Sequence, residues 1–76
     1  MEPATALETV QAIHDAGMVA TADLVAELQS STHEDAHAAL EVLVQQGRLY
    51  SSRVTAGGVE PGQQNYMFTS YVPLVA

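Results

Sequence analysis

Apolar residues recur every three or four positions at the start of the chain, which is the spacing of one face of an α-helix. Thr5 followed by Glu8 has the form of a capping box, in which the two side chains satisfy free backbone N–H groups at a helix start. Gly17 is suited to the left-handed residue that ends a helix. The pattern predicts a first helix over about residues 5–16. Its apolar positions are Ala6, Leu7, Val10, Ile13 and Ala16.

Two more helices are expected before residue 48. Thr21 can cap the second, whose inward face comprises Leu24, Val25 and Leu28. Ser31 with Glu34 forms another capping-box pattern, which opens a third helix that Gly47 ends. The apolar positions of this third helix are Ala36, Ala39, Leu40, Leu43 and Val44. Between the first two helices, residues 18–20 predict a lone β-bridge or short strand, or else the entry to the second helix.

After residue 47 the apolar period changes from helical to alternating, which is typical of strands. Residues 48–55 and 64–70 predict a hairpin whose turn is the glycine-rich stretch 56–62. Residues 71–76 form an apolar tail, which Pro73 should keep out of a sheet interior and which packs on the first helix or meets a second subunit. The expected shared core comprises Leu7, Val10, Ile13, Leu24, Leu28, Leu40, Leu43, Leu49 and Phe68.

The order of these elements, and the stretch Ala36-x-x-x-Leu40-x-x-Leu43-x-x-x-Gly47-x-Leu49, resemble the winged-helix superfamily, in particular its bacterial regulator-like branch. The resemblance covers nearly the whole chain, although its motifs are generic. It implies an α+β fold of three helices with a C-terminal β-hairpin wing. It also implies, by analogy with the fold's commonest use, binding of DNA.

Length and composition limit the classes of protein that are compatible with the chain. Its 76 residues indicate a single domain over 1–76, and 47% hydrophobic residues argue against disorder. No apolar run approaches the roughly 20 residues that span a bilayer, so no membrane partner is expected. The start lacks the features of a signal peptide and the chain has no cysteine, which fits a cytoplasmic protein.

Charge is the most informative property of the composition. Nine acidic residues stand against two arginines and no lysine, giving a formal net charge of −7. Residues 1–46 contain eight of the acids and neither Lys nor Arg. Such a field repels nucleic acid and favours basic partners, although solubility or a salty cytoplasm would select the same composition.

This charge bears directly on DNA binding. The outward positions of the third helix would be Glu34, Asp35, His37, Ala38 and Glu41. A helix that reads DNA needs Arg or Lys for phosphates and Arg, Asn or Gln for base edges, and this face offers acids instead. Binding through the wing, by Arg48, Arg53, Gln63 and Gln64, stays as an alternative.

Residues 33–37 match the His-Glu-x-x-His pattern of zinc metalloproteases, with two histidines one helical turn apart. A catalytic zinc needs a third protein ligand. Glu41 is eight residues from His33, about 12 Å along a helix, and His14 is on another helix. We therefore expect no enzyme activity and no cofactor, with His33 and His37 as weak candidates for metal binding.

Aromatic residues and methionine gather near the C-terminus, beside both arginines, and these residue types are enriched at protein interfaces. They are Tyr50, Tyr66, Met67, Phe68 and Tyr71. Strand alternation places Leu49, Tyr66 and Phe68 inward, with Tyr50 and Met67 more exposed.

The interpretation that follows is a non-catalytic interaction module: an adaptor, regulatory subunit or inhibitor of a larger protein with a basic surface, such as one that ordinarily holds nucleic acid. The expected contact residues are Glu34, Asp35, Glu41, Tyr50, Met67 and Tyr71. The alternative is a small DNA-binding transcriptional regulator that acts as a homodimer through its wing.

Overall fold

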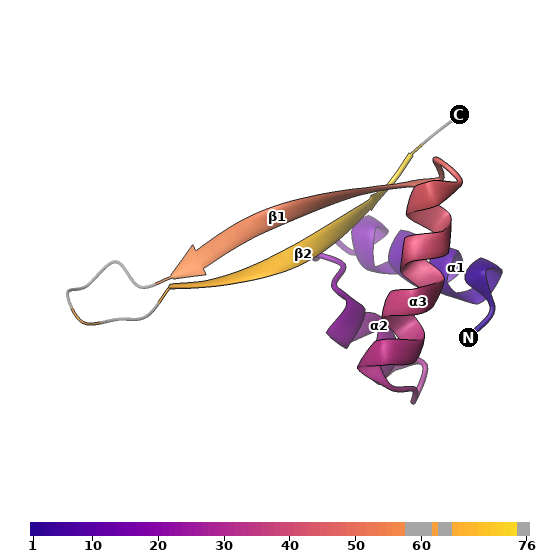
Figure 1. The fold of residues 1–76 in the computed structure, drawn as a ribbon, viewed down its shortest axis with the longest axis horizontal. Helices are drawn as coiled ribbons and strands as arrows, with labels where there is room; N and C mark the ends of the chain where they lie inside the picture. Colours follow the sequence, from indigo (N-terminus) through magenta and orange to yellow (C-terminus); the bar gives the residue numbers. More distant parts are fainter. Residues whose placement is uncertain (58–61, 63–64, 75–76) are drawn as a thin grey trace.

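A computed structural model describes residues 1–57, 62 and 65–74 of the chain. The described part has an α+β architecture, with the elements α1 (Pro3–Asp15), α2 (Ala22–Leu28), α3 (His33–Gln45), β1 (Leu49–Gly57) and β2 (Asn65–Pro73). The helices pack together at one end, and the antiparallel pair β1–β2 projects away from them as a long ribbon (Figure 1). The molecule is therefore elongated, with extents of 42 × 27 × 23 Å.

Two of the three predicted helix starts need correction. α1 begins at Pro3, and proline suits this position because it lacks the N–H that a first helical residue would leave unbonded. Thr5 therefore lies inside the helix and does not cap it. Thr21 caps α2 as predicted, accepting a hydrogen bond from the Leu24 N–H at 3.2 Å. α3 is capped by Thr32, which accepts from the Asp35 N–H at 3.1 Å, whereas Ser31 donates its hydroxyl to the Asp35 carboxylate.

Both predicted helix stops are confirmed. Gly17 and Gly47 have φ angles of +76° and +73°, in the left-handed region that glycine adopts without strain. After α1, the N–H of Gly17 bonds the carbonyl of His14 and the N–H of Met18 bonds that of Ile13. Gly47 and Arg48 make the same pair of bonds after α3. These are Schellman endings, which satisfy carbonyls that a helix end leaves free.

The hairpin is longer than predicted. Ala56 and Gly57, expected in the turn, belong to β1, and residues 58–61 and 63–64 lie outside the described residues. β2 continues through Tyr71 to Pro73, so the expectation of a separate tail from residue 71 is wrong. Proline is tolerated because Pro73 is the last residue of its strand, where it pairs with Leu49.

The predicted bridge between the first two helices is present at Ala20. Its carbonyl accepts the N–H of Tyr71 at 2.9 Å, and the two residues form an isolated antiparallel bridge. Tyr71 also pairs with Ser51 of β1. The connection between α1 and α2 thus adds a one-residue third strand to the base of the ribbon.

The core lies between the three helices and the base of the ribbon. Among the predicted core residues, Val10, Ile13, Leu40, Leu43 and Leu49 are buried, and Leu7, Leu24 and Phe68 are partly buried. The prediction that Leu28 belongs to the core is wrong. Its side chain is 57% exposed, because the seven-residue α2 turns Ala22, Val25 and Ala26 inward.

Within the part of the chain that the structure describes, no helix is both long enough and apolar enough to cross a bilayer.

Candidate functional site

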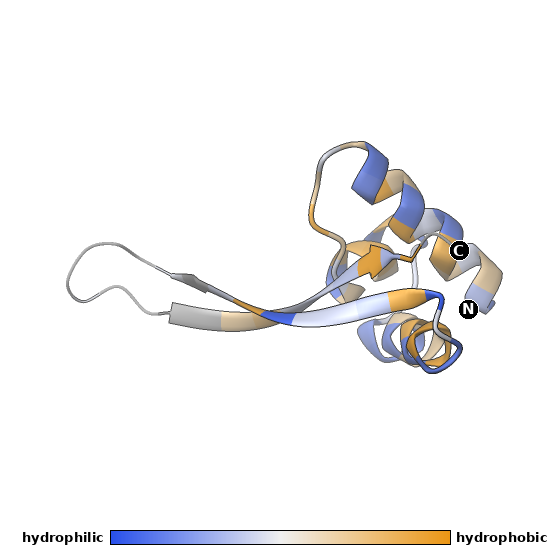
Figure 2. Ribbon diagram, turned by 90° about the horizontal axis from the view of Figure 1, so that it is seen from above, coloured by the Kyte–Doolittle hydropathy of each residue, from blue (hydrophilic) through white to orange (hydrophobic). Residues whose placement is uncertain are grey.

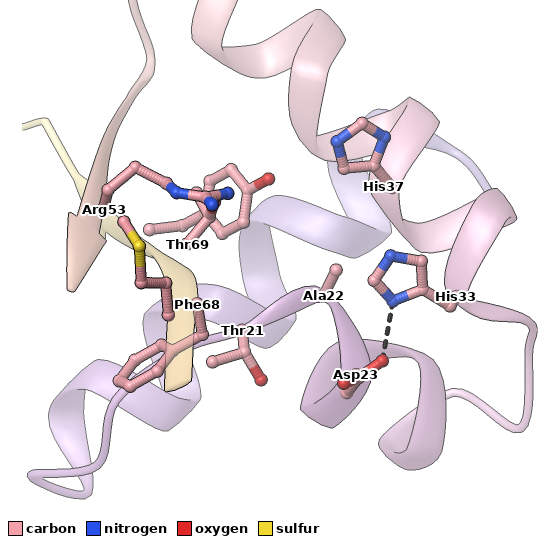
Figure 3. Close-up of a pocket in the computed structure, with 10 residues that line it drawn as sticks. Thr21, Ala22, Asp23, His33, His37, Arg53, Phe68 and Thr69 are labelled. Atoms are coloured by element: carbon pink, nitrogen blue, oxygen red, sulfur yellow. Dashed lines mark hydrogen bonds and ion pairs between the residues drawn. The ribbon is translucent and has the colours of Figure 1, made fainter. Parts of the chain in front are cut away.

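A surface pocket of about 280 Å³ lies where the starts of α2 and α3 face the ribbon (Figure 3). We call it the helix–ribbon groove. Asp23, His33 and His37 line its helical wall. Arg53, Met67 and Thr69 line the wall formed by β1 and β2. The groove therefore brings together side chains from four elements, and its two walls join residues as far apart in the sequence as Asp23 and Thr69.

The helical wall carries two histidines, each in contact with a carboxylate. The Nδ1 atom of His33 lies 2.6 Å from Asp23 Oδ1, and with the carboxylate as the acceptor this ring nitrogen donates the hydrogen bond (Figure 3). The rings of His33 and His37 stack at 6.0 Å with an interplanar angle of 10°. His37 Nε2 lies 3.5 Å from Glu41 Oε1, one turn further along α3. The contacts form a continuous row from α2 along α3.

The row of contacts shows how far His33 and His37, the two weak candidates for metal binding, are placed to hold a metal ion. The structure brings the two histidines together as the sequence spacing predicts, but each already contacts a carboxylate. In the described residues, no three His, Asp or Glu side chains converge on a point where they could hold a metal ion. His14, the other candidate ligand, is exposed on α1. The geometry offers hydrogen bonds and charge rather than a metal cage.

Tyr71, which the sequence predicted as a contact residue, lines the helix–ribbon groove as an almost wholly buried residue. The residue is 2% exposed, because its ring packs in the core while its backbone forms the bridge to Ala20. Its hydroxyl donates a hydrogen bond to Glu41 Oε1 at 3.4 Å. Burial, and then the neighbouring Glu41 carboxylate, raise the pKa of the Tyr71 phenol above its ordinary value. Tyr71 thus remains a neutral donor that holds Glu41 at the edge of the groove.

Asp35, another predicted contact residue, already has partners within the chain. Its carboxylate pairs with the ammonium group of Met1 at 2.6 Å and accepts a hydrogen bond from Ser31. The ammonium group first, and then Ser31, lower the pKa of Asp35 below its ordinary value. The side chain therefore joins the start of α3 to the start of the chain.

The lowered pKa of Asp35 gives an expected pH dependence. A carboxyl whose pKa is depressed by folding stabilises the protein above its unfolded pKa of about 3.9, and this stabilisation is lost as the pH falls through the folded value. The difference in melting temperature between the wild type and Asp35→Asn should therefore shrink as the pH is lowered below about 4. Circular dichroism melts across this range would check it. Glu8→Gln, an exposed change on α1, is the control; an Asp35→Asn difference that persists undiminished at the lowest pH would contradict the assignment.

The structure places the remaining predicted contact residues in different surroundings. Glu34 is exposed in the first turn of α3, and Met67 is exposed and lines the groove. Tyr50 is 59% exposed but lies outside the groove, paired across the ribbon with Val72. All three residues are exposed, as the sequence predicts. They do not gather into one surface, because Tyr50 lies outside the groove.

The residues predicted for a DNA-binding wing are also separated. Arg53 lines the groove, with its Nη1 atom 3.5 Å from Thr69 Oγ1. Arg48 is exposed at the end of α3 and does not line the groove. Gln63 and Gln64 lie outside the described residues.

Sequence reasoning missed Asp23 and Thr69 as groove residues. Asp23 appears in the sequence only as an acidic residue in the first turn of a short helix. Its position opposite His33 depends on how α2 and α3 cross, which no periodicity of the sequence encodes. The register of the ribbon was the available signal for Thr69, since Arg53 and Thr69 are cross-strand partners.

Comparisons of the chain with protein-family models, with characterised proteins and with solved structures gave no match.

Proposed function

We propose that the chain is a non-catalytic winged-helix protein-interaction module, acting as an adaptor, regulatory subunit or inhibitor of a larger protein with a basic surface. The winged-helix assignment is supported by the order of three helices followed by a hairpin. It is supported further by the bridge from Ala20 to Tyr71, which puts a short strand between the first two helices beside the hairpin. In that architecture, α3 and the ribbon form the face that meets a binding partner.

The observation that carries the proposal is the charge of this face. Asp23, Glu34 and Glu41 project from α2 and α3, and the first 46 residues contain neither Lys nor Arg. Complementary potentials steer partners together and suppress wrong ones. A negatively charged helical wall attracts lysine and arginine side chains and repels the phosphates of a duplex.

The groove offers specific contacts for such a cation. Asp23 and Glu41 stand at the two ends of the histidine row, and both carboxylates are partly or largely exposed to solvent. A partner ammonium or guanidinium group at either end of the row would make charge-assisted hydrogen bonds with the carboxylate oxygens there. Met67 on the opposite wall supplies apolar surface for the aliphatic stem of a lysine or arginine.

The test uses two double variants that change the net charge equally. Asp23→Asn/Glu41→Gln, the groove pair, removes the carboxylates at the two ends of the histidine row, and Glu2→Gln/Glu8→Gln removes two exposed carboxylates at α1. A labelled peptide of alternating lysine and serine is titrated with each protein by fluorescence anisotropy at several salt concentrations. The groove pair should weaken binding several-fold more than the α1 pair, because each exposed ion pair contributes about 0.2–1 kcal/mol. Equal losses would show that only net charge matters and would remove the support for a groove.

A DNA titration decides between the proposal and its alternative, a dimeric regulator that binds through its wing. With two arginines per chain, even a dimer engages few phosphates. We expect no specific duplex binding tighter than about micromolar at physiological salt. Nanomolar, sequence-dependent binding that Arg53→Ala abolishes and Glu41→Ala strengthens would establish the regulator in its place.

A further inference from the structure

A second hollow, on a different part of the surface from the helix–ribbon groove, has an almost wholly apolar lining. It has a volume of about 200 Å³ and lies between the end of α1, the connection to α2, and α2 itself. We call it the α1–α2 groove. Its lining residues are Ala12, Ile13, Ala16, Met18, Leu24 and Leu28.

Large apolar side chains at this groove are open to solvent. Met18 is 56% exposed and Leu28 is 57% exposed. The connection between α1 and α2 is drawn in orange in Figure 2, as a hydrophobic segment on the outside of the helical body. Scattered exposed apolar residues are ordinary, but a contiguous group around a hollow marks an interaction site.

Acidic residues flank the α1–α2 groove on both of its helices. Asp15 is three residues after Ala12 on α1, and Glu27 is three residues after Leu24 on α2. Residues three apart are neighbours on a helix surface, so each carboxylate stands beside a groove residue. Both acids are exposed.

The negative charge of Asp15 and Glu27 decides which kind of molecule would bind favourably in the α1–α2 groove. A second copy of the chain would bring its own acids against Asp15 and Glu27, and like charges face to face cost free energy. A partner with lysine or arginine beside its apolar residues would instead gain favourable ion pairs with Asp15 and Glu27. An amphipathic helix presents these two kinds of residue on neighbouring faces and binds grooves in this way.

We propose that the α1–α2 groove docks a basic amphipathic helix of a partner protein, with the partner's apolar side chains seated on Met18 and Leu28 and its cations paired with Asp15 and Glu27. This surface is separate from the helix–ribbon groove, and neither Asp23 nor Glu41 takes part in it. The two proposals therefore fail or succeed independently.

The experiment uses a labelled synthetic helical peptide with leucines on one face and lysines on the other, titrated with the full chain by fluorescence anisotropy. A companion peptide of the same charge carries serine in place of leucine. The leucine peptide should bind at least about tenfold more tightly, which corresponds to ~1.4 kcal/mol. Equal affinities would show attraction by net charge alone and would overturn the proposal.

Variants of the protein locate the binding. Leu28→Ser and Met18→Ser should each weaken binding of the leucine peptide markedly, whereas Tyr50→Ser, at a similarly exposed apolar residue on the ribbon, should not. Melting curves confirm that the three variants fold, which is expected because all three side chains face solvent. Equal effects of Leu28→Ser and Tyr50→Ser would refute the assignment. Self-association in sedimentation velocity that Leu28→Ser abolishes would assign the groove to a second copy and would also refute it.

Discussion

Replacing Leu40 with alanine is expected to lower the free energy of unfolding by about 2–5 kcal/mol. The side chain has no exposed surface, and it lies in the middle of α3 within the core shared by the helices and the ribbon base. The substitution loses the transfer free energy of the removed groups and leaves a cavity that the neighbours fill only in part. Urea denaturation followed by circular dichroism measures the change.

Leu28→Ala is the matched control, since it makes the same chemical change at a side chain that is mostly exposed. Its effect should stay within about 0.5 kcal/mol, as is usual for surface substitutions. For a domain of this size a loss near the upper end of the Leu40 range could abolish folding, because small domains have only marginal stability. Leu40→Met, which nearly conserves volume, then serves as the measurable variant and should cost less than about 1.5 kcal/mol. Similar losses for Leu40→Ala and Leu28→Ala would contradict the observed packing.

Replacing Tyr71 with alanine is expected to cost about 3–5 kcal/mol, in the range of large aromatic residues removed from a core. The ring is nearly fully buried, and the backbone of the same residue pairs with Ala20 on one side and Ser51 on the other. Loss of the ring would loosen the place where the ribbon joins the helices. Thermal and chemical denaturation measure the loss.

Tyr71→Phe separates the ring from its hydroxyl. It keeps the buried area and removes only the long hydrogen bond to Glu41, so the cost should be near the ordinary value for one hydrogen bond, about 0.5–1.5 kcal/mol. A Tyr71→Ala variant as stable as Tyr71→Phe would mean that the ring is not part of the core.

The helices could be predicted from the sequence because their signals are local. Apolar spacing identified Val10, Ile13, Leu40 and Leu43 as core residues, and the two glycines marked helix ends at the correct positions. The errors also have local causes. Thr32 rather than Ser31 caps α3, and neighbouring hydroxyls are equivalent in a sequence pattern.

Features set by tertiary packing could not be predicted. An apolar pattern shows which face of a helix is hydrophobic, but not how much of it other elements cover. Leu28 satisfies the pattern of α2 and still faces solvent, while Tyr71 is buried although it follows the predicted end of its strand. The charge of the candidate face was visible in the sequence, whereas the contact between Asp23 and His33 depends on the crossing of two helices.

Burial along the ribbon is confined to its base. Of the ribbon side chains that the structure describes, Leu49, Ser70 and Tyr71 are buried, whereas Arg53, Thr55 and Met67 further out are exposed. The outer ribbon can therefore change in sequence with little effect on the stability of the helical body. Mutations at Arg53 or Met67, in the groove proposed to meet a partner, and mutations that alter folding therefore fall largely on different residues. A protein divided in this way can acquire new binding preferences along the ribbon without first losing its fold.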